Sequence, residues 1–249
     1  MQYRHAPAAN HASLDAVLVS APGRPTLPVR LTLELLGRAR EHLPGPGPVS
    51  VWDPCCGAGT TLAVLGLLGT GITALAGTDA DPGPLDLARR NLALLDPAGR
   101  AARAAELDGL ARRHGKPAYT DAAAAARALW PAAEVPWTVG TADALDPAAT
   151  AAALGGTRPD VVLADLPHGR QTSWSGADAR TGPDADSAPD TAGPEAGFLT
   201  AVASVLASEA VVVAAGRGRS VPLPSGVRAL ARLRVGHRAA VLARAGDLR

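Results

Sequence analysis

The segment from residue 51 to 61, VWDPCCGAGTT, constrains the fold of this chain more than any other. An apolar strand ends in Asp53 and runs through a glycine-rich bend into a helix. Because Gly57 and Gly59 carry no side chain, a ligand can lie against the main chain where any Cβ would clash. The helix behind the bend offers unpaired N–H groups to an anionic group. The segment therefore predicts a ligand-binding loop, with an ordinary strand-to-helix turn as the alternative.

Two classes of ligand fit such a loop, dinucleotides and S-adenosylmethionine. The dinucleotide fingerprint requires a further glycine at the position of Leu62, and a P-loop requires a lysine that this loop lacks. We therefore expect S-adenosylmethionine as the cofactor. The loop residues expected to bind it are Asp53, Pro54, Cys55, Gly57 and Gly59.

Length and composition limit the class of protein. A chain of 249 residues with 47% hydrophobic residues fits one α/β domain with an appendage. Lys116 is the only lysine, and this arginine bias indicates a GC-rich genome rather than a function. A net charge of +1 neither indicates nor excludes nucleic-acid binding, because charged binding surfaces are local.

The cysteines, the N-terminus and a stretch without charged residues predict the cellular compartment of the protein. Cys55 and Cys56 are adjacent, so they rarely pair, and two thiols without spaced histidines make no zinc site. The N-terminus lacks an apolar signal core. Residues 54–78 carry no charge, but six glycines and five threonines interrupt them. We expect a soluble, cytoplasmic monomer with reduced thiols, no metal and no membrane partner.

Apolar strands alternate with helices along most of the chain. Strands are expected at 49–52, 72–77, 137–140, 160–164 and 210–215, and helices at 60–68, 84–95, 147–154 and 198–207. This alternation predicts an α/β fold with a doubly wound, mostly parallel sheet, whose ligands bind at the carboxyl ends of the strands. Residues 228–235 and 238–244 flank Gly236 and predict a C-terminal antiparallel hairpin.

Other segments extend this core. Residues 1–48 are expected to form an N-terminal extension that packs on a core domain spanning 49–249. Residues 101–130 are rich in alanine and arginine and predict a helical insertion with a break at 115–117. Residues 171–197 are polar and rich in Gly, Pro and Asp, which predicts a mobile loop over the site.

Acidic residues follow two further strands. Asp79 ends the second strand, where a carboxylate can accept both ribose hydroxyls of an adenosyl group. The alternative is that Asp79 or Asp81 caps the next helix. Asp143, preceded by Ala142, follows the third strand and can accept from the exocyclic amine of adenine while a neighbouring N–H donates to the ring. A solvated turn acid is the alternative for Asp143.

The fourth strand is followed by Asp165-Leu166-Pro167-His168, the segment with the most specific chemistry. An exocyclic amine has a lone pair delocalised into its ring. The Asp165 carboxylate and a main-chain carbonyl beside Pro167 can bind its two protons and localise that lone pair, while His168 stacks on the base. An ordinary loop is the alternative. This segment predicts methyl transfer to an amine.

Taken in chain order, these motifs resemble those of the Rossmann-like S-adenosylmethionine-dependent methyltransferases. Asp165-Leu166-Pro167-His168 is similar to the Asn/Asp-Pro-Pro-aromatic motif of amino methyltransferases. Segments spread over nearly the whole chain are similar to the avilamycin-resistance rRNA methyltransferase family; they lie at 3–5, 20–23, 28–31, 52–57, 91–95, 115–117 and 160–163. His168 departs from the family's tyrosine or phenylalanine, and imidazole stacks more weakly with a charge that depends on pH.

The resemblance implies a guanine of 23S rRNA, free or in the large ribosomal subunit, as substrate, with the exocyclic amine favoured. It also implies resistance to an orthosomycin antibiotic. Candidate phosphate contacts are Arg30 and Arg170 beside the pocket, and Arg100, Arg103, Arg112, Arg113 and Lys116 on the inserted helices, where a merely solvated face is the alternative. Two other functions stay open: an amino methyltransferase acting on DNA adenine or protein glutamine, and a non-catalytic RNA-binding relative.

Overall fold

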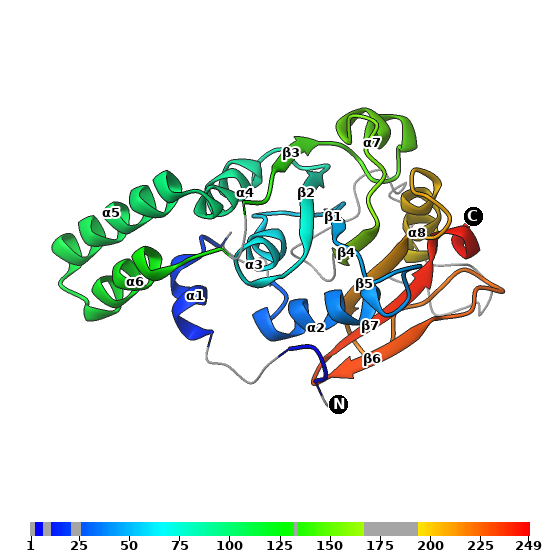
Figure 1. Ribbon diagram of the computed structural model, residues 1–249, viewed down its shortest axis with the longest axis horizontal. Coiled ribbons are helices and arrows are strands. Elements are labelled where there is room, and N and C mark those ends of the chain that lie inside the picture. The colour runs from blue at the N-terminus through cyan, green and yellow to red at the C-terminus, as the bar shows by residue number, and fades with distance from the viewer. Residues whose placement is uncertain (1–2, 7–10, 21–25, 132–133, 167–193) are drawn as a thin grey trace, which may run out of the picture.

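The computed structural model describes residues 3–6, 11–20, 26–131, 134–166 and 194–249. Within them, a seven-stranded sheet has the order β3-β2-β1-β4-β5-β7-β6 (Figure 1). The strands are β1 Val49–Asp53, β2 Ile72–Asp79, β3 Trp137–Thr141, β4 Val161–Asp165, β5 Val211–Arg217, β6 Ala231–Val235 and β7 Arg238–Arg244. Strands β1 to β5 pair in parallel, and β7 runs antiparallel to β5 and β6. The expected sheet and terminal hairpin are confirmed.

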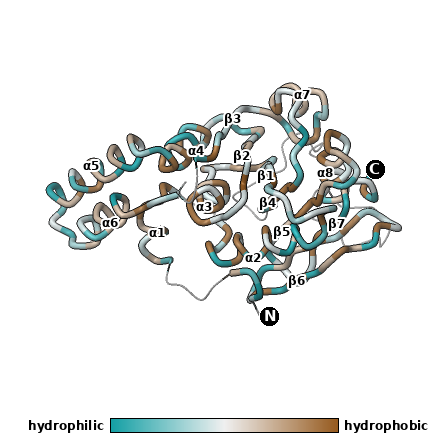
Figure 2. The backbone as a smooth tube through the Cα atoms, in the orientation of Figure 1, coloured by the Kyte–Doolittle hydropathy of each residue, from teal (hydrophilic) through white to brown (hydrophobic). Residues whose placement is uncertain are grey.

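Helices cover both faces of the sheet and divide the core into two layers. On one face, Leu35, Leu62 and Leu92 pack against strand residues. On the other face, Leu199 and Val202 do the same. The first face is covered by α2 Val29–Arg40, α3 Thr60–Leu68 and α4 Leu85–Leu92, and the second by α7 Pro147–Ala153 and α8 Pro194–Ser204. Helix α3 lies between α2 and α4, so it is apolar on all sides, as its colour in Figure 2 shows.

The predicted helical insertion is a hairpin of α5 Pro97–His114 and α6 Pro117–Ala128. Gly115, with φ of +63°, makes the left-handed turn that ends α5. The hairpin extends beyond the β3 edge of the sheet, and α1 Ala12–Val17 packs against α6 (Figure 1). The α5–α6 hairpin begins at Pro97 rather than at the predicted residue 101, because a proline suits the first turn of a helix. No helix in the described part of the chain is long and apolar enough to cross a membrane.

The remaining elements are two short 3₁₀ helices and α8, which starts earlier than predicted. The 3₁₀ helices are η1 Ala93–Leu95 and η2 Ala245–Leu248. Helix α8 begins at Pro194, so residues 194–197 are helical and do not belong to the loop expected at 171–197. A Pro-Glu pair is favoured in the first turn of a helix, and this signal outweighs the loop-like composition around it. The rest of that segment, 171–193, lies outside the described residues.

The N-terminal segment is held on α2 by a buried carboxylate. Glu34, with a fully buried side chain, accepts N–H groups from Arg4, His5 and Ala6 at 2.8, 2.7 and 3.2 Å. It also pairs with Arg38 at 2.7 Å. Burial alone would raise the pKa of Glu34, but these donors hold it below its ordinary value. The segment at 3–6 is therefore fixed to the core by one ionised side chain.

Candidate functional site

The two glycines of the loop after β1 have different roles. Both have positive φ, +52° at Gly57 and +68° at Gly59. A Cβ on Gly59 would lie 2.9 Å from the Cβ of Ala88 in α4, so Gly59 is required for packing. A Cβ on Gly57 would meet no described atom within 4 Å. The main chain at Gly57 therefore lies open at the carboxyl edge of the sheet, as a ligand-binding loop requires.

Asp79, at the end of β2, is fixed against this loop. Its Oδ2 accepts the N–H of Gly57 at 2.8 Å, and its Oδ1 accepts the N–H of Asp81 at 3.0 Å. Asp79 therefore joins β2 to the glycine loop and does not cap α4, whose N-cap is Pro84.

Asp53 is a buried acid beneath the loop. Its side chain is 2% exposed, and its Oδ1 accepts the N–H of Cys55 at 3.1 Å. Burial, together with the nearby carboxylates of Asp165 and Asp79, raises the pKa of Asp53 to about 8. A cation placed near Asp53 would favour its ionised form. The glycine loop and this buried acid thus lie together at the carboxyl edge of the sheet.

The two loop cysteines are free thiols. Burial raises the pKa of both well above the ordinary value, so they are protonated and unreactive. The thiol of Cys55 donates to the main-chain carbonyl of Asp165 at 3.4 Å, which ties the loop to the end of β4. Among the described residues, no cluster of His, Cys, Asp and Glu could hold a metal ion.

The segment after β3 is braced from within the protein. Asp143 Oδ1 accepts the N–H of Leu145 at 2.9 Å. The N–H of Ala142 donates to the carbonyl of Asp79 at 3.1 Å, so this donor is engaged. The strand register places Thr141 beside Asp79, which brings this segment to the same edge as the glycine loop. Contacts of Ala142 and Asp143 with an adenine stay predictions.

Asp165 ends β4 at the same edge of the sheet, with its side chain 13% exposed. Its Oδ1 accepts from Arg238 Nη1 at 2.8 Å, an ion pair that the sequence analysis missed. Arg238 directly follows the predicted hairpin turn, but this position alone does not show which strand β7 joins. Pro167, His168 and Arg170 lie outside the described residues.

A second residue missed from the sequence is Asn91 in α4. This fully buried side chain donates from Nδ2 to the carbonyls of Ala58 and Val19, both at 2.7 Å, and accepts the N–H of Val19 at 2.8 Å. It therefore connects the glycine loop to the N-terminal extension. The signal was a single amide among the apolar residues 92–95.

The arginines proposed to contact RNA differ in their surroundings. Arg112 and Arg113 are exposed near the tip of the α5–α6 hairpin. Arg30 lies 4.0 Å from the centre of the Tyr3 ring, and its Nε donates to the carbonyl of Ala6 at 3.3 Å. The first two remain available to phosphate, whereas Arg30 also holds the N-terminal segment.

Arg100 and Arg103 do not join this basic surface. Arg100 is 7% exposed and donates to the carbonyls of Leu94 and Leu95, where it closes the end of η1. Arg103 donates to the carbonyl of Val17 and pairs with Glu106. Their expected place on an RNA-binding edge is therefore wrong, because both guanidinium groups satisfy main-chain carbonyls.

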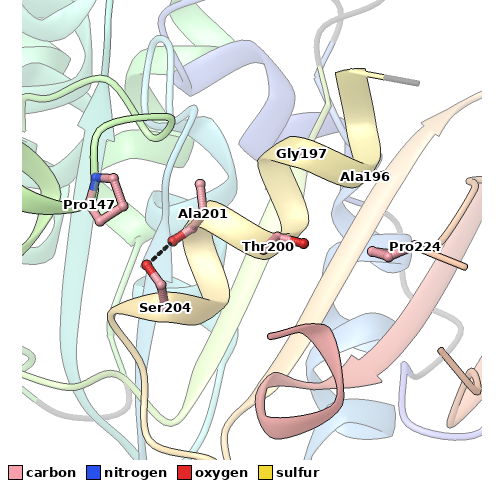
Figure 3. Close-up of a pocket in the computed structure, with 7 residues that line it drawn as sticks. All are labelled: Pro147, Ala196, Gly197, Thr200, Ala201, Ser204 and Pro224. Carbon is pink, nitrogen blue, oxygen red and sulfur yellow. Dashed lines mark hydrogen bonds between the residues drawn. The ribbon is translucent and has the colours of Figure 1, made fainter. Parts of the chain in front are cut away.

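A shallow cavity of about 470 Å³ lies elsewhere, along α8 (Figure 3). Its lining is mostly apolar and consists of Pro147, Ala196, Gly197, Thr200, Ala201, Ser204 and Pro224. None of the residues predicted to bind the cofactor or the base lines it. The candidate site is therefore the carboxyl edge formed by β1, β2 and β4.

The sheet order, the glycine loop after β1 and the acids that end β2 and β4 define a Rossmann-like methyltransferase fold. A family model described as rRNA methyltransferase AviRa matches residues 1–238. The chain therefore belongs to the AviRa family of rRNA methyltransferases.

Relatives support the same conclusion along the full length. The 23S rRNA (guanine(2535)-N(1))-methyltransferase of Streptomyces viridochromogenes is 45% identical over 255 residues, which cover 99% of this chain and 97% of the relative. Two solved structures of rRNA methyltransferase AviRa from the same organism match with a TM-score of 0.86 each and identities of 44% and 45%. Each comparison covers 100% of this chain and 98% of the other.

Proposed function

We propose that this protein transfers a methyl group from S-adenosylmethionine to N1 of a guanine in 23S rRNA. Membership of the AviRa family supports rRNA as the substrate. The name of the relative at 45% identity supports the guanine base and the ring nitrogen N1. The sequence analysis favoured the exocyclic amine, and this name moves the proposed acceptor from that amine to N1.

The residues at the edge of the sheet fit the proposed cofactor. The open backbone at Gly57 leaves room that a Cβ would fill. We assign the ribose hydroxyls to Asp79, which accepts the N–H of Gly57 beside this room. Asp53, whose pKa is raised by burial, is matched to the cationic methionine portion. When bound, this cofactor supplies an electrophilic methyl group on a sulfonium, with a neutral thioether as the leaving group.

The choice of N1 as the acceptor determines what Asp165 must do in the proposed reaction. N1 of neutral guanine carries a proton, so its in-plane electron pair becomes available only when that proton leaves. We assign this proton to the Asp165 carboxylate, which pairs with Arg238. We assign Pro167 to holding the turn rigid and His168 to stacking on the base, by the resemblance to the Asn/Asp-Pro-Pro-aromatic motif.

A base within folded RNA must be exposed or flipped to reach this edge. Arg112 and Arg113 at the hairpin tip are proposed phosphate contacts, and so are Arg30 and Arg170. The substrate is 23S rRNA, free or in the large subunit. By resemblance to the avilamycin-resistance family, the modification would confer resistance to an orthosomycin antibiotic.

The test is transfer of a labelled methyl group to competing substrates. Unmodified 23S rRNA, duplex DNA and a release-factor-like protein are offered together, and we expect label in the rRNA. Label in the DNA or the protein would replace this proposal with the other amino methyltransferase functions. Cofactor binding without transfer to any of them would indicate a non-catalytic relative.

A further inference from the structure

Arg238 and Asp165 come from two strands that are not neighbours. Strand β5 separates β4 from β7, with Ala215 opposite Asp165 on one side and opposite Ala240 on the other. Arg238 precedes Ala240 by two positions, and residues two apart on a strand share a face. The side chains of Arg238 and Asp165 therefore lie on the same face, at the carboxyl edge of β4.

A small residue on the intervening strand β5 leaves room for the Arg238 side chain to reach Asp165. Ala215, fully buried, contributes only a methyl group to the intervening strand. Neighbouring strands lie about 4.8 Å apart, so a long arginine can cross one strand above a small side chain. It reaches Asp165 Oδ1 with Nη1 and the carbonyl of Thr26 with Nη2, both at 2.8 Å.

The ionisable groups around Asp165 indicate what this ion pair does. Asp79 from β2 lies within electrostatic reach of Asp165, and so do Asp53 from β1 and Cys55, which become like charges once they lose their protons. Like charges disfavour the ionised form of a carboxylic acid, and a nearby guanidinium favours it. Arg238, with its side chain 12% exposed, supplies that positive charge from the edge hairpin.

We propose that Arg238 is a positioning residue for methyl transfer, which keeps Asp165 ionised and oriented to accept the proton of the base. This inference rests on the proposed function. Arg238 itself does not contact RNA, because its guanidinium is held by Asp165 and by Thr26. Through Thr26 it also fixes the segment that leads into α2.

The structure provides a matched control on the same strand. Arg244 at the other end of β7 pairs with Glu209 at 2.7 Å and donates to the carbonyl of His42 at 3.0 Å. It thus combines an ion pair with carbonyl contacts, to His42 and, at 3.4 Å, to Glu209, as Arg238 combines an ion pair with a contact to Thr26, but at the edge of the sheet opposite the site. R244M and R238M remove equivalent interactions, and only the second removes the charge beside Asp165.

The test is the pH dependence of the maximal methyl-transfer rate. In R238M we expect the acid limb to move to higher pH by about one unit or more. On the acid side of this limb the rate should fall about tenfold, because a larger share of the proton acceptor is then protonated. The KM for S-adenosylmethionine should change by less than about twofold, since Arg238 makes no loop contact. R238K should restore part of the shift, and R244M should leave the profile unchanged.

Two outcomes would overturn the inference: an unshifted acid limb in R238M, or an equal shift in R244M, which would indicate a structural tie. Should R238M fail to fold, a ¹³C titration of the Asp165 carboxyl in wild type and in R238Q, which also removes the charge, reports ionisation directly; equal midpoints would also contradict the inference. If the wild type labels no RNA, the proposed function fails. If the wild type labels RNA and the limb does not move in R238M, only the role of Arg238 fails.

Discussion

Gly59 in the glycine loop and Ala88 in α4 pack so closely that a Cβ added to Gly59 would lie 2.9 Å from the Cβ of Ala88. G59A should therefore cost about 1–2 kcal/mol for its positive φ, and about 1–3 kcal/mol more for overpacking against α4. G57A should cost only the first amount, since its Cβ meets no described atom within 4 Å. Urea unfolding of the two variants measures this difference.

Cofactor affinity should fall most in G57A, the variant that is expected to lose less stability than G59A. G57A fills the space proposed for the ligand, so its Kd for S-adenosylmethionine should rise about tenfold or more, or about 1.4 kcal/mol. Calorimetric titration of the folded variant checks this. A G57A protein that binds the cofactor as the wild type does would remove Gly57 from the site.

The raised pKa of Asp53 predicts an unusual dependence of stability on pH. The folded protein holds a proton on Asp53 up to about pH 8, whereas the unfolded chain releases it near the ordinary 3.8. Between these values the folded state binds the additional proton, so this group's contribution to stability falls as pH rises. Urea unfolding of the cofactor-free protein across this range should show a steeper decline for the wild type than for D53N.

D53N is the matched control because its amide oxygen can still accept the N–H of Cys55. Equal slopes in the two proteins would show that Asp53 is not neutral in the folded state. The cationic cofactor should bind the ionised carboxylate, so wild-type affinity for S-adenosylmethionine should rise with pH through the same window.

Asn91 should be important for stability and for the shape of the glycine loop. N91L leaves two carbonyls and one N–H without this partner, and an unsatisfied buried group costs about 1–3 kcal/mol. We expect a loss of about 2–4 kcal/mol in unfolding free energy, with faster amide exchange at 57–59. R89A on the same helix removes only the exposed pair with Asp86, and a similar loss in R89A would contradict this role.

Much of the fold was predictable because its signals are local. The apolar run from Thr60 to Leu68 has the predicted bounds, and the glycine loop before it follows the predicted strand. Asp79 and Asp165 were found because buried parallel strands are apolar, which makes an acid at the end of each conspicuous. The start of α8 at Pro194 was not, because Gly, Pro and Asp around it are typical of loops.

The remaining features depend on contacts between distant segments. Arg238 meets Asp165 only because β7 lies beside β5, and no local pattern specifies that arrangement. Arg100 and Arg112 lie on the same helix, yet one closes η1 while the other is exposed. Sequence composition alone treats both as surface charges, since burial of an arginine depends on which carbonyls the fold brings to it.

The most direct test of the account is the identity of the nucleoside formed when wild type and D165A act on unmodified 23S rRNA with S-adenosylmethionine. We predict 1-methylguanosine from the wild type and none from D165A, with cofactor binding retained in the variant. N²-methylguanosine from the wild type would return the acceptor to the exocyclic amine, and wild-type yields from D165A would contradict the role of Asp165.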